Sequence, residues 1–341
     1  MNRLIRKLAG LLAAAGIYLL SAGGAYDSLS TWMADRPQEE RMKNVAVPAV
    51  LTKSMPPESS AAKAAVMLQT LSMPALLDPA PSALPVPTAE TVLETTIEGG
   101  MRIKNETAYW VDAGEILAEG PGLTLPADEP QILIIHTHAS EAYTQAGADR
   151  YSPSDANRTE DTQYNVVRIG DELTGILTEA GLNVIHDRGI YDYPSYTGSY
   201  ARAEAAIEQY LESCPGIRVV LDIHRDALGS GDVVYKTMAE EEGSVASQIM
   251  LLVGTDESGL EHPHWRGNLA FAMYLQNAVN SVCPTLMRPV ALVPQRYNQQ
   301  LTPGSLIVEV GSNGNTLREA LAAIRLFGRA IAPALAELVA W

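Results

Sequence analysis

The sequence contains only two cysteines, Cys214 and Cys283. They neither form a CxxC pair nor support a disulfide framework of the kind found in small secreted domains. We therefore expect both to be small side chains of a hydrophobic core. A fold held together by cysteine chemistry is excluded.

Runs of Lys and Arg are also missing after residue 7, and the net charge is −16. Because neutralising phosphate groups requires clustered basic side chains, the sequence argues against nucleic-acid binding. An acidic surface also tends to avoid anionic lipids, so membrane attachment would need a dedicated segment. With 47% apolar and 19% charged residues, the composition is that of a folded protein.

Residues 8–26 form such a segment, because they carry no charge. At about 1.5 Å per residue, this stretch comes close to the roughly 30 Å thickness of the hydrocarbon core. Basic residues precede it and acidic residues follow, so residues 1–27 predict a cytoplasmic N-terminus and a transmembrane helix. A cleaved signal peptide with small residues at 21–25 is the alternative, but the apolar run exceeds its usual length. In both cases the rest of the chain is exported.

Three further regions are predicted beyond this anchor. Residues 28–95 are rich in Ala, Pro and Ser, which predicts a disordered stalk. Residues 96–129 form a transitional segment with a few short strands, among them the GEILAEGP region. Residues 130–341 have the patterning of a folded domain.

Apolar runs alternate with amphipathic segments throughout that domain. Strands are predicted over residues 132–136, 182–187, 217–224, 245–253 and 305–311. Helices are predicted over residues 164–180, 201–213, 265–281 and about 316–339. The alternation indicates an α/β domain with a mainly parallel sheet.

Three of the predicted strands end in residues that can bind a metal or move a proton. The first is followed by His136, His138 and Glu141, the third carries His224, and the last contains Glu309. Ligands bind beyond the carboxyl ends of parallel strands, and a catalytic zinc takes three protein ligands and one water. Glu309 lies inside an apolar run, where a buried carboxylate is costly unless it is paired. The pattern favours a zinc hydrolase.

The motifs HTHASE, LDIHRDA and LIVEVGSNGNTLREA occur in this order and resemble the catalytic domain of the stage II sporulation protein P family. The resemblance covers about residues 130–341. It implies a zinc N-acetylmuramoyl-L-alanine amidase, whose fold is a twisted sheet flanked by helices. Such enzymes cut the amide between the muramic acid lactyl group and the first alanine of the stem peptide. Cleavage of peptide cross-links is also associated with the family.

The resemblance implies roles for individual residues. His138 and His224 match the histidine ligands of the zinc ion, with His136 as an alternative to His138. Glu309 matches the glutamate that activates the water and then handles the proton of the leaving group.

The acidic zinc ligand and the substrate contacts are less sharply indicated. Glu141 follows His138 at the spacing HxxE, whereas Asp161 lies just before the next helix, where the wider amidase group has its ligand. We choose Glu141 and keep Asp161 as the alternative. Arg225 could orient His224 or contact substrate. Arg296 and Asn298 could bind stem-peptide carboxylates, although a solvated loop explains them equally well.

The resemblance further implies a role in septal peptidoglycan thinning and engulfment during sporulation. The catalytic domain would act on the outer face of the cell membrane, in the septal intermembrane space. Expected partners are peptidoglycan and the stage II sporulation proteins D and M. Two other readings remain: a non-catalytic peptidoglycan-binding scaffold, and an exported zinc enzyme of the carboxypeptidase type. Analysis of the cleaved products separates them.

Overall fold

The computed structural model describes residues 44–47, 101–230, 233–241 and 243–340. The predicted transmembrane helix and most of the predicted stalk lie outside these residues. Within the described part of the chain, no helix is both long and apolar enough to cross a lipid bilayer.

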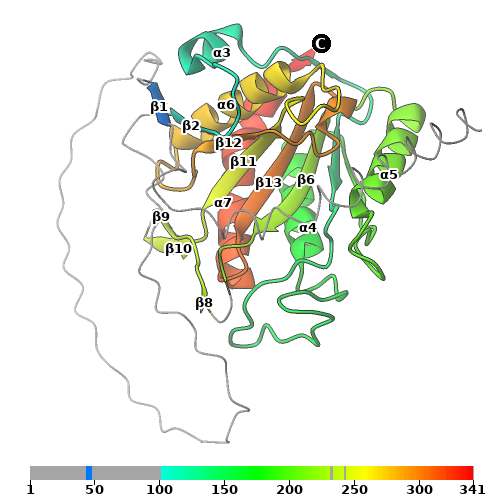
Figure 1. Ribbon diagram of the computed structural model, residues 1–341, viewed down its shortest axis with the longest axis vertical. Helices are drawn as coiled ribbons and strands as arrows, with labels where there is room; N and C mark the ends of the chain where they lie inside the picture. Colours follow the sequence, from blue (N-terminus) through cyan, green and yellow to red (C-terminus); the bar gives the residue numbers. More distant parts are fainter. Residues whose placement is uncertain (1–43, 48–100, 231–232, 242, 341) are drawn as a thin grey trace, which may run out of the picture.

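One eight-stranded sheet forms the centre of the molecule (Figure 1). In spatial order its strands are β1 (Asn44–Val47), β2 (Met101–Asn105), β12 (Val290–Val293), β11 (Ile249–Gly254), β13 (Gly304–Ser312), β6 (Val219–Asp226), β4 (Ile132–Ile135) and β5 (Val184–His186). Two-residue and three-residue strands pair outside it: β3 (Leu125–Pro126) with β14 (Val339–Ala340), β7 (Gly229–Ser230) with β8 (Val233–Val234), and β9 (Ala239–Glu241) with β10 (Ser244–Ala246).

The sheet is mainly parallel, as predicted, but it changes direction once in its interior. Strands β13, β6, β4 and β5 run parallel to one another. Strands β11, β12 and β2 are also mutually parallel, yet β11 runs antiparallel to β13. The carboxyl ends of β4, β6 and β13 therefore meet at one edge, while those of β2, β11 and β12 meet at the opposite edge.

Helices cover both faces of the sheet. They are α3 (Ala113–Glu119), α4 (Val166–Glu179), α5 (Ser199–Ser213), α6 (Trp265–Asn280) and α7 (Leu317–Ala336), with a 3-10 turn η2 (Gln299–Leu301). Helices α4, α6 and α7 pack on one face and form the larger core. Helix α5 packs on the other face, where Ala203 and Ile207 contact Leu133 and Ile135 of β4.

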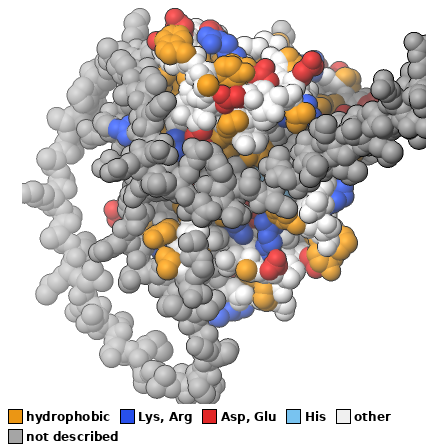
Figure 2. Space-filling model, viewed as in Figure 1, with side chains coloured by type: hydrophobic (Ala, Val, Ile, Leu, Met, Phe, Trp, Pro, Cys, Tyr) orange, Lys and Arg blue, Asp and Glu red, His pale blue; other side chains and the backbone are white. Residues whose placement is uncertain are grey.

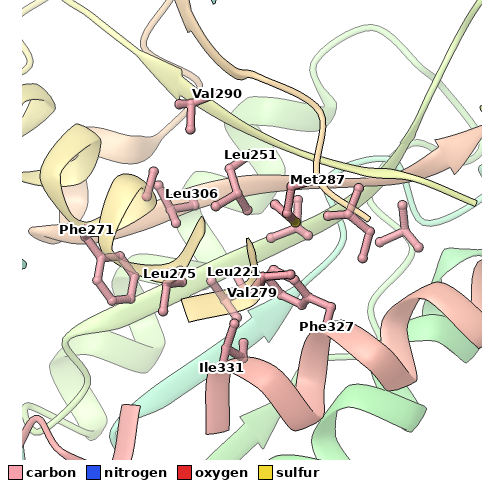
Figure 3. Packing of buried hydrophobic residues seen from close by; sticks show 14 of the residues in the cluster. Leu221, Leu251, Phe271, Leu275, Val279, Met287, Val290, Leu306, Phe327 and Ile331 are labelled. Carbon is pink, nitrogen blue, oxygen red and sulfur yellow. The ribbon is translucent and has the colours of Figure 1, made fainter. Parts of the chain in front are cut away.

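The larger core lies between the sheet and α6 and α7 (Figure 3). Leu221, Leu251 and Leu306 project from three neighbouring strands toward Phe271 of α6 and Phe327 of α7. Alternation along each strand explains this, because every second side chain points to the same face. The residues between them face the opposite side, and Asp222, His224 and Glu309 are among these residues.

Several predicted elements need correction. The GEILAEGP region forms helix α3 and not a strand, since Asp112 caps it by accepting from the amide of Glu115, and Gly120 ends it at φ 70°. The predicted strand 245–253 is divided between β10 and β11. Strands β2 and β12 were not predicted as members of the sheet, and β1 lies within the predicted stalk. Neither cysteine forms a disulfide. Cys283 is buried, as expected, whereas Cys214 is only partly buried against the core beneath α5.

The described surface mixes charged and apolar side chains. On the face seen in Figure 2, acidic and basic side chains are interspersed. The most exposed large apolar side chains of the described residues, Trp110 and Val282, lie on separate segments. The polar groups that need an explanation are those buried at the edge of the sheet.

Candidate active site at the sheet edge

Strands β4, β6 and β13 bring the three predicted motifs together. His224 of β6 and Glu309 of β13 are direct neighbours in the parallel register. His138 lies three residues beyond the end of β4, which is the other neighbour of β6. The prediction that these strand ends meet is therefore confirmed, because adjacent parallel strands end at the same edge of a sheet.

His138 and His224 face each other at the site. Their ring centroids are 5.3 Å apart and the two planes are nearly perpendicular. The ring of Tyr196 stacks on His138 at 4.4 Å, and Tyr200 meets it edge-on at 5.3 Å. Burial lowers the pKa of His138 to about 3, so its ring is neutral and able to act as a metal ligand.

Glu141 approaches the second histidine. Its Oε2 lies 3.5 Å from Nδ1 of His224 and accepts a hydrogen bond from the amide of Arg225. Burial would raise the pKa of Glu141, but Arg225, His224 and Arg158 hold it below its usual value, so the group is a carboxylate. Asp161 is exposed, and its carboxylate accepts from the amide of Gln163. The structure thus places Glu141, and not Asp161, beside His224.

His224 is held between two acidic side chains. Its Nε2 lies 2.9 Å from Oδ1 of Asp222, without the alignment of a full hydrogen bond. Burial alone would lower the pKa of His224, but Asp222 and Glu141 raise it well above its usual value. Asp222 itself accepts hydrogen bonds from the amide and the hydroxyl group of Thr137.

His136 lies on the opposite face of the sheet from His138. Its Nε2 is 2.8 Å from Nε2 of His186, and Nδ1 is 3.2 Å from the carbonyl oxygen of Ile223. Gly170 of α4 packs directly against both rings. His136 therefore joins β4 to α4, and the structure does not bring it to the site as an alternative to His138.

Glu309 is the buried carboxylate that the sequence indicated. Its side chain is almost fully enclosed, and Oε2 has no hydrogen-bond partner. Burial, reinforced by the charge of Asp226, raises the pKa of Glu309 to about 8. Arg288 forms a 2.6 Å ion pair with Asp226 behind it. A carboxyl group with a pKa near neutrality can both accept and return a proton.

The three residues predicted to bind substrate each contact another part of the chain. Arg225 is buried and donates to the carbonyl oxygens of Ala142 and Asn157. Arg296 pairs with Glu204 of α5 at 3.3 Å. Asn298 donates to the carbonyl oxygen of Tyr200 at 2.8 Å. These contacts hold the loops and the start of α5 in place, and contact with substrate stays a prediction for all three.

The donor types at the site suit zinc, which prefers histidine nitrogen and carboxylate oxygen. Nδ1 of His138 and Oε2 of Glu309 are buried polar atoms without a partner. The 3.5 Å between Nδ1 of His224 and Oε2 of Glu141 is close to the separation of two ligands on a tetrahedral zinc, about 3.3 Å. As the side chains stand, however, no group of three or more His, Cys, Asp or Glu residues within the described chain is arranged as a metal site.

Sequence reasoning missed several residues of the site. Asp222 gave the same signal as Glu309, a carboxylate inside an apolar strand, and could have been found in that way. Arg158 and Asp192 gave no such signal, since they come from loops. Arg158 contacts Glu141 at 3.3 Å and Asp192 at 2.8 Å, and its guanidinium lies 4.8 Å from the ring centre of Tyr196.

The chain is similar in sequence to a known protein family and to a curated relative. A family model described as stage II sporulation protein P matches residues 84–332. The stage II sporulation protein P of Bacillus subtilis (strain 168) is 24% identical over 207 residues, which are 56% of this chain and 48% of that relative. The chain thus spans about half the length of the curated relative it matches.

Solved structures give more distant similarities. An N-acetylmuramoyl-L-alanine amidase of Nostoc punctiforme is 14% identical, with a TM-score of 0.35, over 61% of this chain and 96% of its own. The CwlD amidase from Clostridioides difficile, solved in complex with the GerS lipoprotein, is also 14% identical, with a TM-score of 0.36, over 61% and 98%.

Proposed function

This chain belongs to the stage II sporulation protein P family, and from that membership and the buried site we propose that it is a zinc-dependent peptidoglycan hydrolase. The proposed reaction is that of an N-acetylmuramoyl-L-alanine amidase, which cuts the bond between the lactyl group and the stem peptide. The observation that carries the proposal is Glu309, a buried carboxyl group with a raised pKa, next to His224 in the register of two parallel strands.

His138, Glu141 and His224 are the residues that would hold the metal. The support for this set is its donor chemistry, the unpartnered Nδ1 of His138, and the short approach of Glu141 to His224. A bound zinc ion would polarise the scissile carbonyl group and lower the pKa of the attacking water.

Glu309 would move the proton. Its carboxylate takes a proton from the attacking water and gives it to the alanine nitrogen. The C–N bond then breaks, and the stem peptide leaves with a neutral amino group. Burial raises the pKa of Glu309, so its carboxylate is a stronger base than that of an exposed glutamate. Tyr196 and Tyr200, which enclose His138, would limit the access of bulk water to the site.

The test is mass spectrometry of purified peptidoglycan digested by the full chain, with zinc and then with a chelator. We expect zinc-dependent release of stem peptides that begin with L-alanine. Glu309→Gln should lower the rate at least about 100-fold, the usual scale of a lost general base, while zinc binding is retained. Glu241→Gln is the matched control, because Glu241 is a buried glutamate that instead binds Thr285.

Other products would change the assignment. Cut cross-links with the stem peptides still on the glycan would indicate an endopeptidase. Loss of a C-terminal residue alone would indicate a carboxypeptidase. Binding of peptidoglycan without any product, from a folded protein that holds zinc, would indicate a scaffold. Near-normal cleavage by Glu309→Gln would remove Glu309 as the proton carrier.

We also propose where the reaction takes place. The apolar N-terminal run would anchor the chain in the cell membrane, with the catalytic domain on the outer face. Its partners would be septal peptidoglycan and the stage II sporulation proteins D and M. Family membership supports this setting, and an accessibility assay with an impermeant reagent on cells would test the orientation.

A further inference from the structure

Asp222 is a buried carboxylate that the proposed reaction does not use. It lies on β6 two residues before His224, so both side chains point to the same face of the sheet. Only 6% of its surface is exposed. A carboxylate enclosed to this degree is costly unless its oxygens are bound, so its partners indicate what it does.

One set of partners comes from the loop after β4. Oδ1 of Asp222 accepts from the backbone amide of Thr137 at 2.8 Å, and Oδ2 accepts from the hydroxyl group of Thr137 at 2.6 Å. Thr137 is itself fully buried. It directly precedes His138 and lies four residues before Glu141, so this pair of hydrogen bonds fixes the beginning of the loop that carries both side chains.

The other partner is on the same strand. Oδ1 of Asp222 also lies 2.9 Å from Nε2 of His224, while the other ring nitrogen of His224 faces Glu141 at 3.5 Å. One carboxylate thus contacts both the loop with His138 and Glu141 and the ring of His224. Carboxylates commonly orient a functional histidine through the ring nitrogen that is not used in the chemistry.

We propose that Asp222, acting through Thr137, is a positioning residue that sets the loop of His138 and Glu141 against the ring of His224. The proposal rests on the proposed function in one respect, because it takes these three side chains as the working groups. Asp192 binds the same loop by accepting from the amide and the hydroxyl group of Ser140. Asp222 instead contacts both Thr137 and His224, so the two aspartates differ in what they connect.

The first test uses the full chain without metal and records the imidazole nitrogen signals by long-range ¹H–¹⁵N NMR. The chain has six histidines, and His→Gln variants assign their signals. We expect Asp222→Asn to shift the ring signals of His224, and Thr137→Val to shift those of His138. Thr159→Val is the matched control, since it removes another buried hydroxyl group, which donates to the carbonyl oxygen of Ser152. Unchanged His224 signals in Asp222→Asn would overturn the proposal.

The second test measures zinc affinity by competition with a chelating dye. Asp222→Asn and Thr137→Val should each weaken zinc binding by between about 10-fold and 100-fold, the range found when an outer partner of a ligand is lost. Thr137→Ser keeps the hydroxyl group and should restore the affinity to within about threefold, as should Thr159→Val. Full zinc affinity in both Asp222→Asn and Thr137→Val would contradict the inference.

The two proposals fail in different ways. If the unaltered chain binds no zinc, the proposed function is wrong, and the metal-free imidazole signals still decide the role of Asp222. If Asp222→Asn does not fold, as judged by circular dichroism, the comparison of Thr137→Val with Thr137→Ser decides it.

Discussion

Glu309 shares one face of β13 with Ile307, while Val308 and Val310 on the other face pack into the larger core. The side chain of Glu309 is therefore enclosed, and burial raises its pKa to about 8. His138 is enclosed in the same way, and its pKa falls to about 3. At the residue scale, burial favours the neutral form of both groups. Neutral His138 can bind a metal, and Glu309, once deprotonated, is a stronger base than an exposed carboxylate.

His262 allows a prediction at the same scale, away from the proposed site. Burial and the neighbouring His264 lower the pKa of His262 to about 4, below the 6.5 of the unfolded chain. Its contribution to stability is therefore complete above about pH 6.5 and is lost as the pH falls toward about 4. The unfolding free energy, measured with urea, falls between pH 7 and pH 4. We expect this fall to be about 1 to 3 kcal/mol smaller in His262→Gln than in the unaltered chain.

His264→Gln is the comparison for this measurement. Because His264 is the second cause of the lowered pKa of His262, after burial, this variant should reduce the pH dependence less than His262→Gln does. The comparison concerns the change in unfolding free energy between pH 7 and pH 4 in each variant, so a uniform loss of stability does not affect it. An identical pH dependence in His262→Gln and the unaltered chain would show that His262 is not held neutral.

At the scale of elements, α4 offers two glycines with opposite surroundings. A Cβ atom on Gly170 would lie 2.6 Å from Nε2 of His186 and 2.7 Å from the ring of His136, whereas one on Gly175 would meet nothing within 4 Å. We expect Gly175→Ala to stabilise the protein by about 0.5 to 1 kcal/mol, because alanine favours the helix. Gly170→Ala should destabilise it by about 1 to 3 kcal/mol, since the buried histidine pair must move.

Thermal and urea unfolding of the two variants check this prediction. Since both changes are the same substitution in one helix, intrinsic helix propensity cancels in the comparison and the contact with the histidines remains. Equal stabilisation by both alanines would mean that α4 can move away from β4 and β5 without cost.

At the scale of the whole molecule, the direction of the sheet changes between β11 and β13. Strands β6 and β13 lie at the centre and are buried along their full length, whereas β5 lies at the edge and is only partly buried. We expect amides of β6 and β13 to exchange with solvent only through global unfolding, and those of β5 to exchange at least about tenfold faster. Hydrogen exchange followed by mass spectrometry measures both.

Equally slow exchange in β5 would indicate that something covers this edge of the sheet. Faster exchange in β6 than in β5 would contradict the strand order itself. The measurement also bears on the site, because His224 and Glu309 depend on β6 and β13 keeping their register.

The sequence alone determined the local features of the fold and the side-chain types that gather at the candidate site. Helical spacing and capping residues placed α4, α5, α6 and α7 to within a few residues, since these signals come from neighbours along the chain. A carboxylate within an apolar run identified Glu309 for the same reason. The motifs of residues 130–341 indicated the family that the comparison then showed.

The tertiary structure alone decided which of these groups meet. In it β11 lies antiparallel beside β13, and His136 lies on the face opposite His138. Glu141 lies next to His224, whereas Asp161 is exposed. It also joins Asp222 to Thr137, 85 residues earlier. Such contacts depend on strand order and on which face each side chain takes, and both are settled by packing between distant segments.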